Sequence, residues 1–281
     1  MSTPALPGEQ QVAATAHSSG YAIEFDNVSI AFDEKVVLDG ISFKLPCAET
    51  KALFGVAGSG KSVLLKLAMG LIRPDSGRII MLGEEVTRMT ERELFELRGR
   101  VGIVFQESAL FDSLKVWENV AFRLMENKIA PDEIERRVRE SLKFVELEQT
   151  YDMFPSELSG GMRRRVAIAR AIVSHPEVLL YDSPTGGLDP VTSNTIVELI
   201  MKQRDVYKTS ALMVTHRLQD AFTMASHEFD KKKNEMVAIP KGQRGEVPMS
   251  FLILKDGKVI FDGDAQQLAA SRDEYIREYI S

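Results

Sequence analysis

The sequence Gly-Val-Ala-Gly-Ser-Gly-Lys-Ser at residues 55–62 constrains the fold of this chain more than any other stretch. It matches the phosphate-binding pattern G-x-x-x-x-G-K-[ST]. The apolar run 52–54 precedes it, and apolar residues at helical spacing follow it: Val63, Leu64, Leu65 and Leu67. This order predicts a strand, a glycine-rich loop and a helix. The alternative interpretation is a glycine turn that only happens to precede a lysine.

The residue types in this loop suit a bound phosphate. Glycines let the backbone curl so that successive N–H groups point into one concavity, and the positive end of the following helix also favours an anion. Lys61 adds a charge for the outer phosphates, and the Ser62 hydroxyl is a ligand for Mg²⁺. We therefore expect the loop to bind phosphates together with Mg²⁺.

The composition indicates a globular protein without a nucleic-acid surface. The chain has 281 residues, 44% hydrophobic and 27% charged, and its net charge of −6 argues against the basic face that nucleic acids require. Its single cysteine, Cys47, cannot form an internal disulfide, which fits a reducing cytoplasm. No apolar run approaches the roughly 20 residues of a membrane span, and the N-terminal sequence does not match a secretory signal. Attachment to a membrane would therefore require another chain.

Strand and helix patterns alternate after a polar start. Residues 1–20 are rich in small and polar residues and are predicted to form a mobile tail. Apolar or alternating stretches then predict strands at 21–32, 36–43, 52–54, 78–82, 101–105, 178–181, 211–214 and 250–254. This alternation predicts a mostly parallel sheet covered on both faces. Ligands in such folds lie at the carboxyl ends of the strands.

Residues 107 to about 160 are predicted to be mostly helical. One helix starts at Pro131, and its apolar face comprises Ile134, Val138, Leu142 and Val145. Its opposite face is charged, and we interpret it as solvated surface: Glu135, Arg136, Arg137, Arg139 and Glu140. A new helix is expected after Ser159-Gly-Gly161.

Polar residues stand where several of these strands end. Asp182 follows an apolar strand, and a carboxylate there can hold Mg²⁺ from the side facing Ser62. Gln106 and His216 each follow another apolar strand. The run Leu158–Met162 places small residues at a helix N-terminus, which is a second position favourable for phosphate. Taken singly, each of these features also has a purely structural interpretation.

In this order the motifs resemble those of the ABC-transporter ATPase family, over residues 21–281. The resemblance implies an α/β P-loop NTPase fold. Its mostly parallel core sheet would carry an N-terminal antiparallel β subdomain and an inserted α-helical subdomain at about 107–161. The ATPase domain would span 21–265, and 266–281 would form a C-terminal helical tail.

The resemblance also assigns site residues. Gln106 matches the Q-loop glutamine, Asp182 the Walker B aspartate and His216 the switch histidine. Leu158–Met162 match the signature LSGGQ with Met in the last place, and Leu188-Asp189 match the D-loop. ATP would be contacted by Phe32, Gly55, Val56, Ala57, Gly58, Ser59, Gly60, Lys61, Ser62, Ser159, Gly160, Gly161 and Asp189. Mg²⁺ would be held by Ser62, Gln106 and Asp182, and the catalytic positions would be Lys61, Gln106, Ser183 and His216. Phe32 would stack on adenine; a core aromatic is the other interpretation of this residue.

Family membership would also imply an assembly. Two such subunits sandwich two ATP molecules, each between one chain's P-loop and the other's signature motif. The helical subdomain would contact integral-membrane permease subunits. Three runs resemble the ATPases of Mce/Mla-type lipid transporters: 106–120, 158–170 and 273–279. This implies phospholipid or another hydrophobic cargo, a membrane-anchored Mce-type substrate-binding protein, and a peripheral position on the cytoplasmic side of the inner membrane of a diderm bacterium.

The sequence departs from the family pattern at Ser183. The family has a glutamate directly after the Walker B aspartate, where it polarises the attacking water, and a serine hydroxyl is no general base at neutral pH. Loss of such a group lowers a rate by about 10²–10⁴-fold. We therefore expect normal binding of Mg·ATP with slow hydrolysis, or hydrolysis through an unidentified carboxylate or bound water. The alternative is an ATP-gated subunit whose partner performs the hydrolysis.

A second departure is the charged insertion at about 227–249. It contains Lys231-Lys-Lys233, Pro240 and Pro248, and we expect a solvent-exposed hairpin, with a partner-binding element as the alternative. Two other functions stay open at this point. One is an ABC subunit for another solute, and the other is a soluble ABC protein of translation or DNA repair, which the acidic single cassette disfavours.

Overall fold

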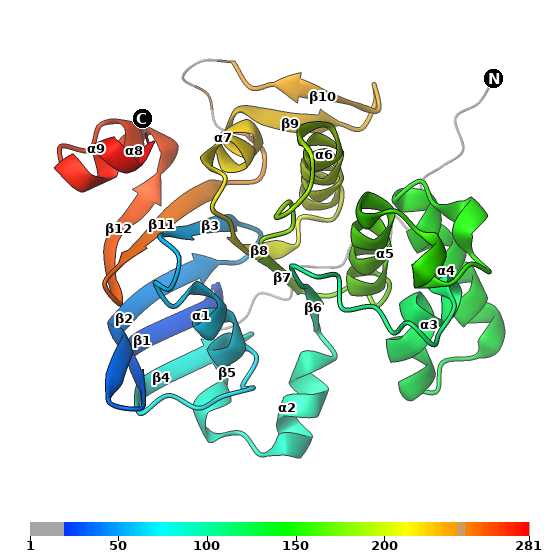
Figure 1. Ribbon diagram of the computed structural model, residues 1–281, viewed down its shortest axis with the longest axis horizontal. Coiled ribbons are helices and arrows are strands. Elements are labelled where there is room, and N and C mark those ends of the chain that lie inside the picture. Colours follow the sequence, from blue (N-terminus) through cyan, green and yellow to red (C-terminus); the bar gives the residue numbers. More distant parts are fainter. Residues whose placement is uncertain (1–19, 241–242, 244, 281) are drawn as a thin grey trace.

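A six-stranded sheet forms the centre of the molecule (Figure 1). The computed structural model describes residues 20–240, 243 and 245–280, so the expected mobile tail lies, apart from Gly20, outside the described residues. In spatial order the strands are β12 (Lys258–Asp264), β11 (Met249–Lys255), β3 (Thr50–Gly55), β8 (Ser210–Val214), β7 (Val178–Asp182) and β6 (Val101–Val104). All neighbours in this sheet pair in parallel except β11 and β12, which are antiparallel.

A second, antiparallel sheet covers one side of the centre. Its order is β2 (Lys35–Pro46), β1 (Tyr21–Phe32), β4 (Ser76–Met81) and β5 (Glu84–Glu85). Apolar side chains alternate along β1, and Phe25 stacks on Phe43 of β2 with ring centroids 4.8 Å apart. The predicted fold class is therefore confirmed: a mostly parallel core with an N-terminal antiparallel sheet.

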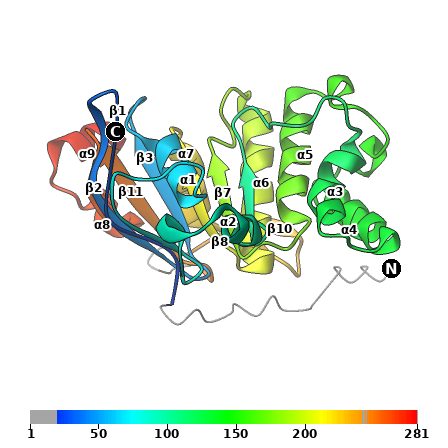
Figure 2. The same ribbon diagram turned by 90° about the horizontal axis from the view of Figure 1, so that it is seen from below.

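The two faces of the central sheet bury different cores. Because side chains alternate along a strand, Leu53, Leu180 and Leu212 face one core, and Phe54, Tyr181 and Met213 face the other. Helices α1 (Lys61–Ala68) and α2 (Glu91–Arg98) complete the first core together with the antiparallel sheet. Helices α6 (Pro190–Tyr207) and α7 (Leu218–Ser226) cover the second face (Figures 1 and 2).

Helices α3 (Val116–Glu126), α4 (Pro131–Phe144) and α5 (Gly160–Ile172) form a group at the end of the molecule opposite β1 and β2 (Figure 2). In α4, the predicted apolar residues Val138 and Leu142 are fully buried. The expectation of helix from residue 107 onwards is wrong at its start. Turns and loop occupy 105–115, where Ser108 and Ala109 have positive φ angles of 63° and 47°. These dihedrals are incompatible with a right-handed helix.

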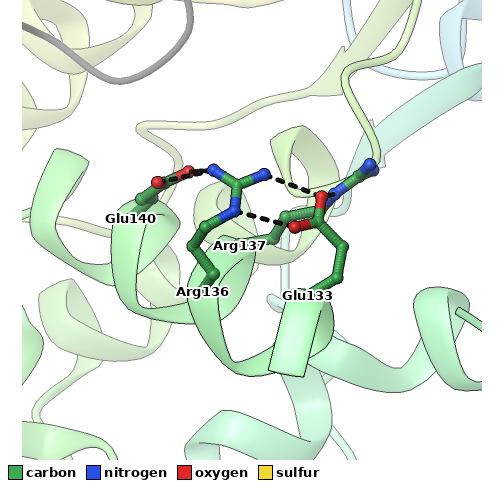
Figure 3. A network of polar contacts seen from close by, with 4 residues as sticks. All are labelled: Glu133, Arg136, Arg137 and Glu140. Carbon is green, nitrogen blue, oxygen red and sulfur yellow. Dashed lines mark hydrogen bonds and ion pairs between the residues drawn. The ribbon is translucent and has the colours of Figure 1, made fainter. Parts of the chain in front are cut away.

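The charged face of α4 carries a network of ion pairs (Figure 3). Arg136 donates to both Glu133 and Glu140, and Arg137 also donates to Glu133, with N···O distances of 2.6–2.9 Å. Hydrogen bonds from Arg136 and Arg137 lower the pKa of Glu133 to about 2. These i,i+3 and i,i+4 pairs are at the surface, in agreement with the predicted solvated face.

Helix α2 was not predicted from the sequence. Its N-terminus has a capping box, in which the Thr90 hydroxyl accepts from the Glu93 N–H and the Glu93 carboxylate accepts from the Thr90 N–H. Leu94 and Leu97 are its buried residues. The spacing Thr90-x-x-Glu93 is a sequence signal that could have located this helix.

The insertion forms a hairpin, but it is half-buried rather than fully exposed. Strands β9 (His227–Asp230) and β10 (Glu235–Ala238) pair antiparallel beside α6 (Figure 1). A buried pair on α6 anchors the hairpin, since Arg204 donates to the His227 carbonyl at 2.9 Å and Asp205 accepts from the Phe229 N–H at 2.8 Å. These contacts leave β9 half-buried, which the charge of the segment did not reveal.

The C-terminal residues form two short helices, α8 (Ala265–Ala269) and α9 (Glu274–Ile280). Ile276 of α9 is buried in the second core, and Tyr275 lies under the ammonium of Lys255 at 4.0 Å from its ring centroid. Helix α9 is thus packed on the domain. Among the described helices, none has the length and apolar character needed to cross a bilayer.

Candidate nucleotide site

The parallel register brings the strand-end residues to one edge of the central sheet. Leu53 pairs with Val214, Val214 with Asp182, and Tyr181 with Val104. The P-loop, Asp182, His216 and Gln106 all follow from these strand ends, so the sheet gathers four motifs that are widely separated in the sequence.

The loop at 55–62 has the predicted geometry. It connects β3 directly to α1, and Ser59 and Gly60 are buried while Val56, Ala57 and Gly58 are exposed. Gly60 is the N-cap of α1 with φ 93°, and a Cβ there would lie 2.5 Å from Leu38 Cδ2. Both the left-handed backbone and the close approach of β2 therefore require glycine at this position.

Lys61 contacts the loop itself, and Ser62 contacts the end of the neighbouring strand β7. The Lys61 ammonium donates to the carbonyls of Gly55 and Val56, both at 2.8 Å, and lies 3.3 Å from Ser59 Oγ. Burial lowers the pKa of Lys61, and the charge of Asp182 opposes this shift. The Ser62 hydroxyl is 3.5 Å from Asp182 Oδ1. A hydroxyl and a carboxylate at this spacing are oxygen donors of the kind that Mg²⁺ prefers.

Ser183 lies in a tight turn at 183–186, directly after Asp182. Its φ is 47° and its side chain is only 7% exposed. The Ser183 N–H donates to the Val214 carbonyl and its own carbonyl accepts from the Gly186 N–H, both at 2.9 Å. The residue at the expected glutamate position therefore has a short side chain and is nearly buried. Its backbone is held by hydrogen bonds on both sides.

Gln106 and His216 are both exposed at this edge of the sheet. A Cβ added to Gly186 would lie 3.6 Å from Gln106 Cγ, so the glutamine side chain lies beside the 183–186 turn. His216 comes two residues after β8, where the Thr215 N–H donates to the Leu53 carbonyl of β3. The structure thus places both residues near the strand ends on which the P-loop and Asp182 stand.

Phe32 ends β1 and is 45% exposed. It belongs to neither of the two buried cores. The alternative interpretation as a core aromatic is therefore wrong, and the ring is free to stack on a planar ligand.

The motif at 158–162 starts α5. Ser159 is the N-cap and its hydroxyl accepts from the Met162 N–H at 3.2 Å, while Gly160 begins the helix. Asp189 is likewise the N-cap of α6, and its pKa is lowered by hydrogen bonds from the Thr192 side chain and N–H. Both Ser159 and Asp189 are exposed, so both helix N-termini are accessible to a ligand or a second chain.

Three buried hydrogen bonds beside the site were not predicted. Arg164 of α5 donates to the carbonyls of Ser183 and Gly186, and the Thr185 hydroxyl donates to Asp220 of α7 at 2.5 Å. The sequence signal for Arg164 was available, since it stands at intervals of four from Ile168 and Ile172 on the buried stripe of α5.

The comparisons with known proteins agree with this geometry. The profile of the family described as "ABC transporter" matches residues 38–186, which include the P-loop, the motif at 158–162 and the 183–186 turn. The chain belongs to the ABC transporter family. It is an ATP-binding subunit of that family, whose members are ATPases.

Three similar proteins illustrate the range of the family. The chain is 31% identical to the intermembrane phospholipid transport system ATP-binding protein MlaF of Haemophilus influenzae, over 92% of this chain and 89% of MlaF. It is 38% identical to the probable ribonucleotide transport ATP-binding protein mkl of Mycobacterium leprae, over 73% of this chain and 59% of that protein. A dimeric ATP-binding cassette solved in a post-hydrolysis state with ADP and phosphate superposes with a TM-score of 0.71 at 27% identity, covering 86% of this chain and 98% of the other.

Proposed function

We propose that this protein is the energy-coupling subunit of a transporter that moves phospholipid or another hydrophobic substrate. The observation that carries the proposal is the similarity to MlaF over 259 residues, which is 92% of this chain and 89% of MlaF. ATP binding would close a dimer of two such subunits, and hydrolysis with product release would open it.

The chain's own residues supply most of the nucleotide site in this proposal. The backbone N–H groups of 55–60 and the ammonium of Lys61 bind the phosphates, and Phe32 stacks on the adenine. Lys61 would exchange its present contacts with the Gly55 and Val56 carbonyls for phosphate oxygens, which better compensate its charge. Gln106 orients the attacking water and His216 contacts the γ-phosphate.

Mg²⁺ fits the oxygen donors at this site. Ser62 Oγ and Asp182 Oδ1 are 3.5 Å apart, and Gln106 adds an amide oxygen at the same edge of the sheet. The described residues contain no group of three or more His, Cys, Asp or Glu side chains that could hold an ion by themselves. Mg²⁺ is usually bound through one or two carboxylates, here Asp182, and keeps several waters while it binds substrate phosphates. When bound, the ion neutralises charge on the β- and γ-phosphates.

Hydrolysis is slow in this proposal because Ser183 provides no basic group. Its side chain is nearly buried in the 183–186 turn, so it has little freedom to position a water. The rate would then depend on charge stabilisation by Lys61 and on positioning by Gln106 and His216, which supply most of the catalysis in phosphoryl transfer.

In a dimer, both the P-loop and the motif at 158–162 of each chain would contact ATP. Each ATP would lie between the P-loop of one subunit and the exposed N-terminus of α5 in the other. Permease subunits would dock on the helical side, where large apolar side chains are 36–47% exposed on or near α2, α3 and the loop after β6: Phe95, Phe105, Phe111 and Met125. With these permeases the chain would be peripheral on the cytoplasmic face of the inner membrane, next to an anchored Mce-type substrate-binding protein.

The proposal is tested by reconstitution. The neighbouring genes are searched for a multi-span permease and an anchored binding protein. The subunit is co-expressed with them, and the complex is placed in vesicles that carry a fluorescent phospholipid. We expect Mg·ATP-dependent movement of the label, and none with the Lys61→Ala variant. A complex that hydrolyses ATP without moving lipid would favour another solute, and the similarity to mkl makes a nucleotide cargo the first alternative to assay.

The same purified complex distinguishes the proposed function from two others. A subunit that binds ATP and closes the dimer but releases no phosphate would be an ATP-gated switch, a possibility raised by Ser183. Co-purification with RNA or DNA instead of membrane proteins would indicate a soluble ABC protein. The net charge of −6 argues against that outcome.

A further inference from the structure

Arg164 is the buried middle residue of the basic run 163–165 on α5. Its residue is 5% exposed, while Arg163 is exposed and Arg165 half-buried. Arg163 and Arg165 donate to carbonyls on the helical side, those of Leu158 and Val145. Arg164 alone of these three reaches across to the central sheet.

The guanidinium of Arg164 holds the 183–186 turn. Nη1 donates to the Ser183 carbonyl at 3.1 Å and Nη2 donates to the Gly186 carbonyl at 3.4 Å. Its Nε is buried without a hydrogen-bond partner among the described residues. A buried charge is expensive unless its contacts compensate it. The turn that carries the expected glutamate position is therefore held by a side chain of α5, and burying the charge of that side chain costs desolvation free energy.

A second contact links the same helix to the start of α6. A Cβ on Gly161 would lie 2.5 Å from Thr192 Cγ2, and a Cβ on Gly160 would lie 3.9 Å from Leu188 Cδ2. These two neighbours flank Asp189 in space and in sequence. The bare backbone of the signature glycines therefore packs directly on the segment that continues from the 183–186 turn.

Helix α5 also holds the loop after Gln106. Arg170 donates to the carbonyls of Ser108 and Ala109 at 2.7 and 2.6 Å, where the chain passes through two consecutive left-handed residues. A helix moves as a rigid element, so a displacement of α5 acts on both loops that border the hydrolytic position. Arg164 would transmit this displacement to the 183–186 turn, and Arg170 would transmit it to the loop after Gln106.

We propose that Arg164 is a positioning residue that couples the two nucleotide sites of the dimer. The N-terminus of α5 binds the ATP held by the P-loop of the second subunit, and Arg164 passes the resulting shift of α5 to the 183–186 turn beside the chain's own ATP. Occupation of one site thereby sets the geometry of the other. This inference rests on the proposed sandwich dimer.

The test compares three variants in the assembled complex. Arg164→Met removes the charge and both donors. Arg164→Lys keeps the charge but cannot reach both carbonyls with a planar fork. Arg165→Met is the matched control, because it makes the same change on the next residue of α5, where the lost contact is to Val145. Phosphate release is measured against ATP concentration, and ADP affinity is measured by calorimetry.

For Arg164→Met we expect a kcat about tenfold lower, as for the loss of charged hydrogen bonds, and a Hill coefficient near one. KM and ADP affinity should stay near their wild-type values, since the hydrogen bonds of Arg164 among the described residues go to the 183–186 turn and not to the P-loop. Arg164→Lys should be intermediate and Arg165→Met like wild type. A purely structural role would lower all parameters together with the melting temperature.

A second readout serves if turnover is too slow to fit. Hydrogen exchange of the Gly186 amide, which donates to the Ser183 carbonyl, should slow on addition of Mg·ATP in the wild type and in Arg165→Met but not in Arg164→Met. Equal exchange and equal cooperativity in Arg164→Met and Arg165→Met would overturn the inference. If Arg164→Met does not fold, wild-type cooperativity and exchange in Arg164→Lys would overturn it. A wild-type chain that never dimerises with Mg·ATP would refute the proposed function itself, and the inference with it.

Discussion

Replacing Ser183 with glutamate tests whether the hydrolytic step is limited by a missing carboxylate. The residue stands directly after Asp182 in the 183–186 turn, which is where the family carries its glutamate, so Ser183→Glu restores a carboxylate at that position. A general base contributes about 10²–10⁴ to a rate. We expect turnover in Ser183→Glu to rise by about 10²-fold or more, which corresponds to about 3 kcal/mol off the barrier.

The structure indicates that the fold tolerates this change. The φ angle of 47° is as unfavourable for serine as for glutamate, so the backbone cost is the same in both chains. The side chain at 183 is 7% exposed, and glutamate must therefore extend into the open side of the turn. The guanidinium of Arg164, bound to the carbonyl of the same residue, reduces the cost of bringing a carboxylate there. The free energy of unfolding should change by no more than about 2 kcal/mol.

The assay is phosphate release by the assembled complex at saturating Mg·ATP. Ser183→Gln is the matched control, because glutamine has the size of glutamate but is no base, and it should not exceed the wild-type rate. Turnover in Ser183→Glu that is unchanged or lower, with ATP affinity retained, would refute the reasoning. It would mean that another group already fills the role of the missing glutamate.

Three further predictions concern separate elements. Phe32→Ala should raise the ATP dissociation constant by about fivefold to 100-fold, the effect of losing one base-stacking ring, while Val36→Ala on the neighbouring exposed strand should not; calorimetry measures both. Thr90→Ala should lower the free energy of unfolding by about 0.5–2 kcal/mol in urea, because it removes the N-cap of α2. For Glu133 the folded pKa of about 2 lies below the usual value of 4.5 for a glutamate, so its contribution to the free energy of unfolding is present above pH 4.5 and is lost as the pH falls toward 2. The stability difference between wild type and Glu133→Gln should therefore be larger at pH 6 than at pH 3, and an equal difference at both would contradict the role of the network in Figure 3.

Sequence patterns predicted those parts of the fold that depend on short-range order. The apolar strand before residue 55 and the helix after residue 61 are local features, and the period of the apolar residues identified both. The same is true of α4, whose buried Val138 and Leu142 followed from helical spacing. Helix α2 also depends on local order. It was not predicted because its capping box at Thr90 and Glu93 was overlooked.

Other features depended on contacts between distant segments. The half-buried state of the β9–β10 hairpin comes from Arg204 and Asp205, more than 20 residues earlier in the chain. Its lysines suggested full exposure, because charged side chains favour solvent. Their charge does not indicate whether the backbone of the segment packs against another element. Phe32 shows the reverse case, since an aromatic at a strand end reads equally well as core or surface until the neighbouring elements are placed.

The sequence by itself determined the chemistry at the nucleotide loop, because the glycines, Lys61 and Ser62 are consecutive and their roles follow from residue type. It also determined that position 183 lacks a carboxylate. Only the tertiary structure decided what surrounds that position. The register of β6 and β7 places the 183–186 turn beside Gln106, and the packing of α5 brings Arg164 to the carbonyls of that turn from 19 residues away. Residue spacing indicates that Arg164 lies on the buried stripe of α5, but which carbonyls it reaches depends on how the helix lies against the sheet.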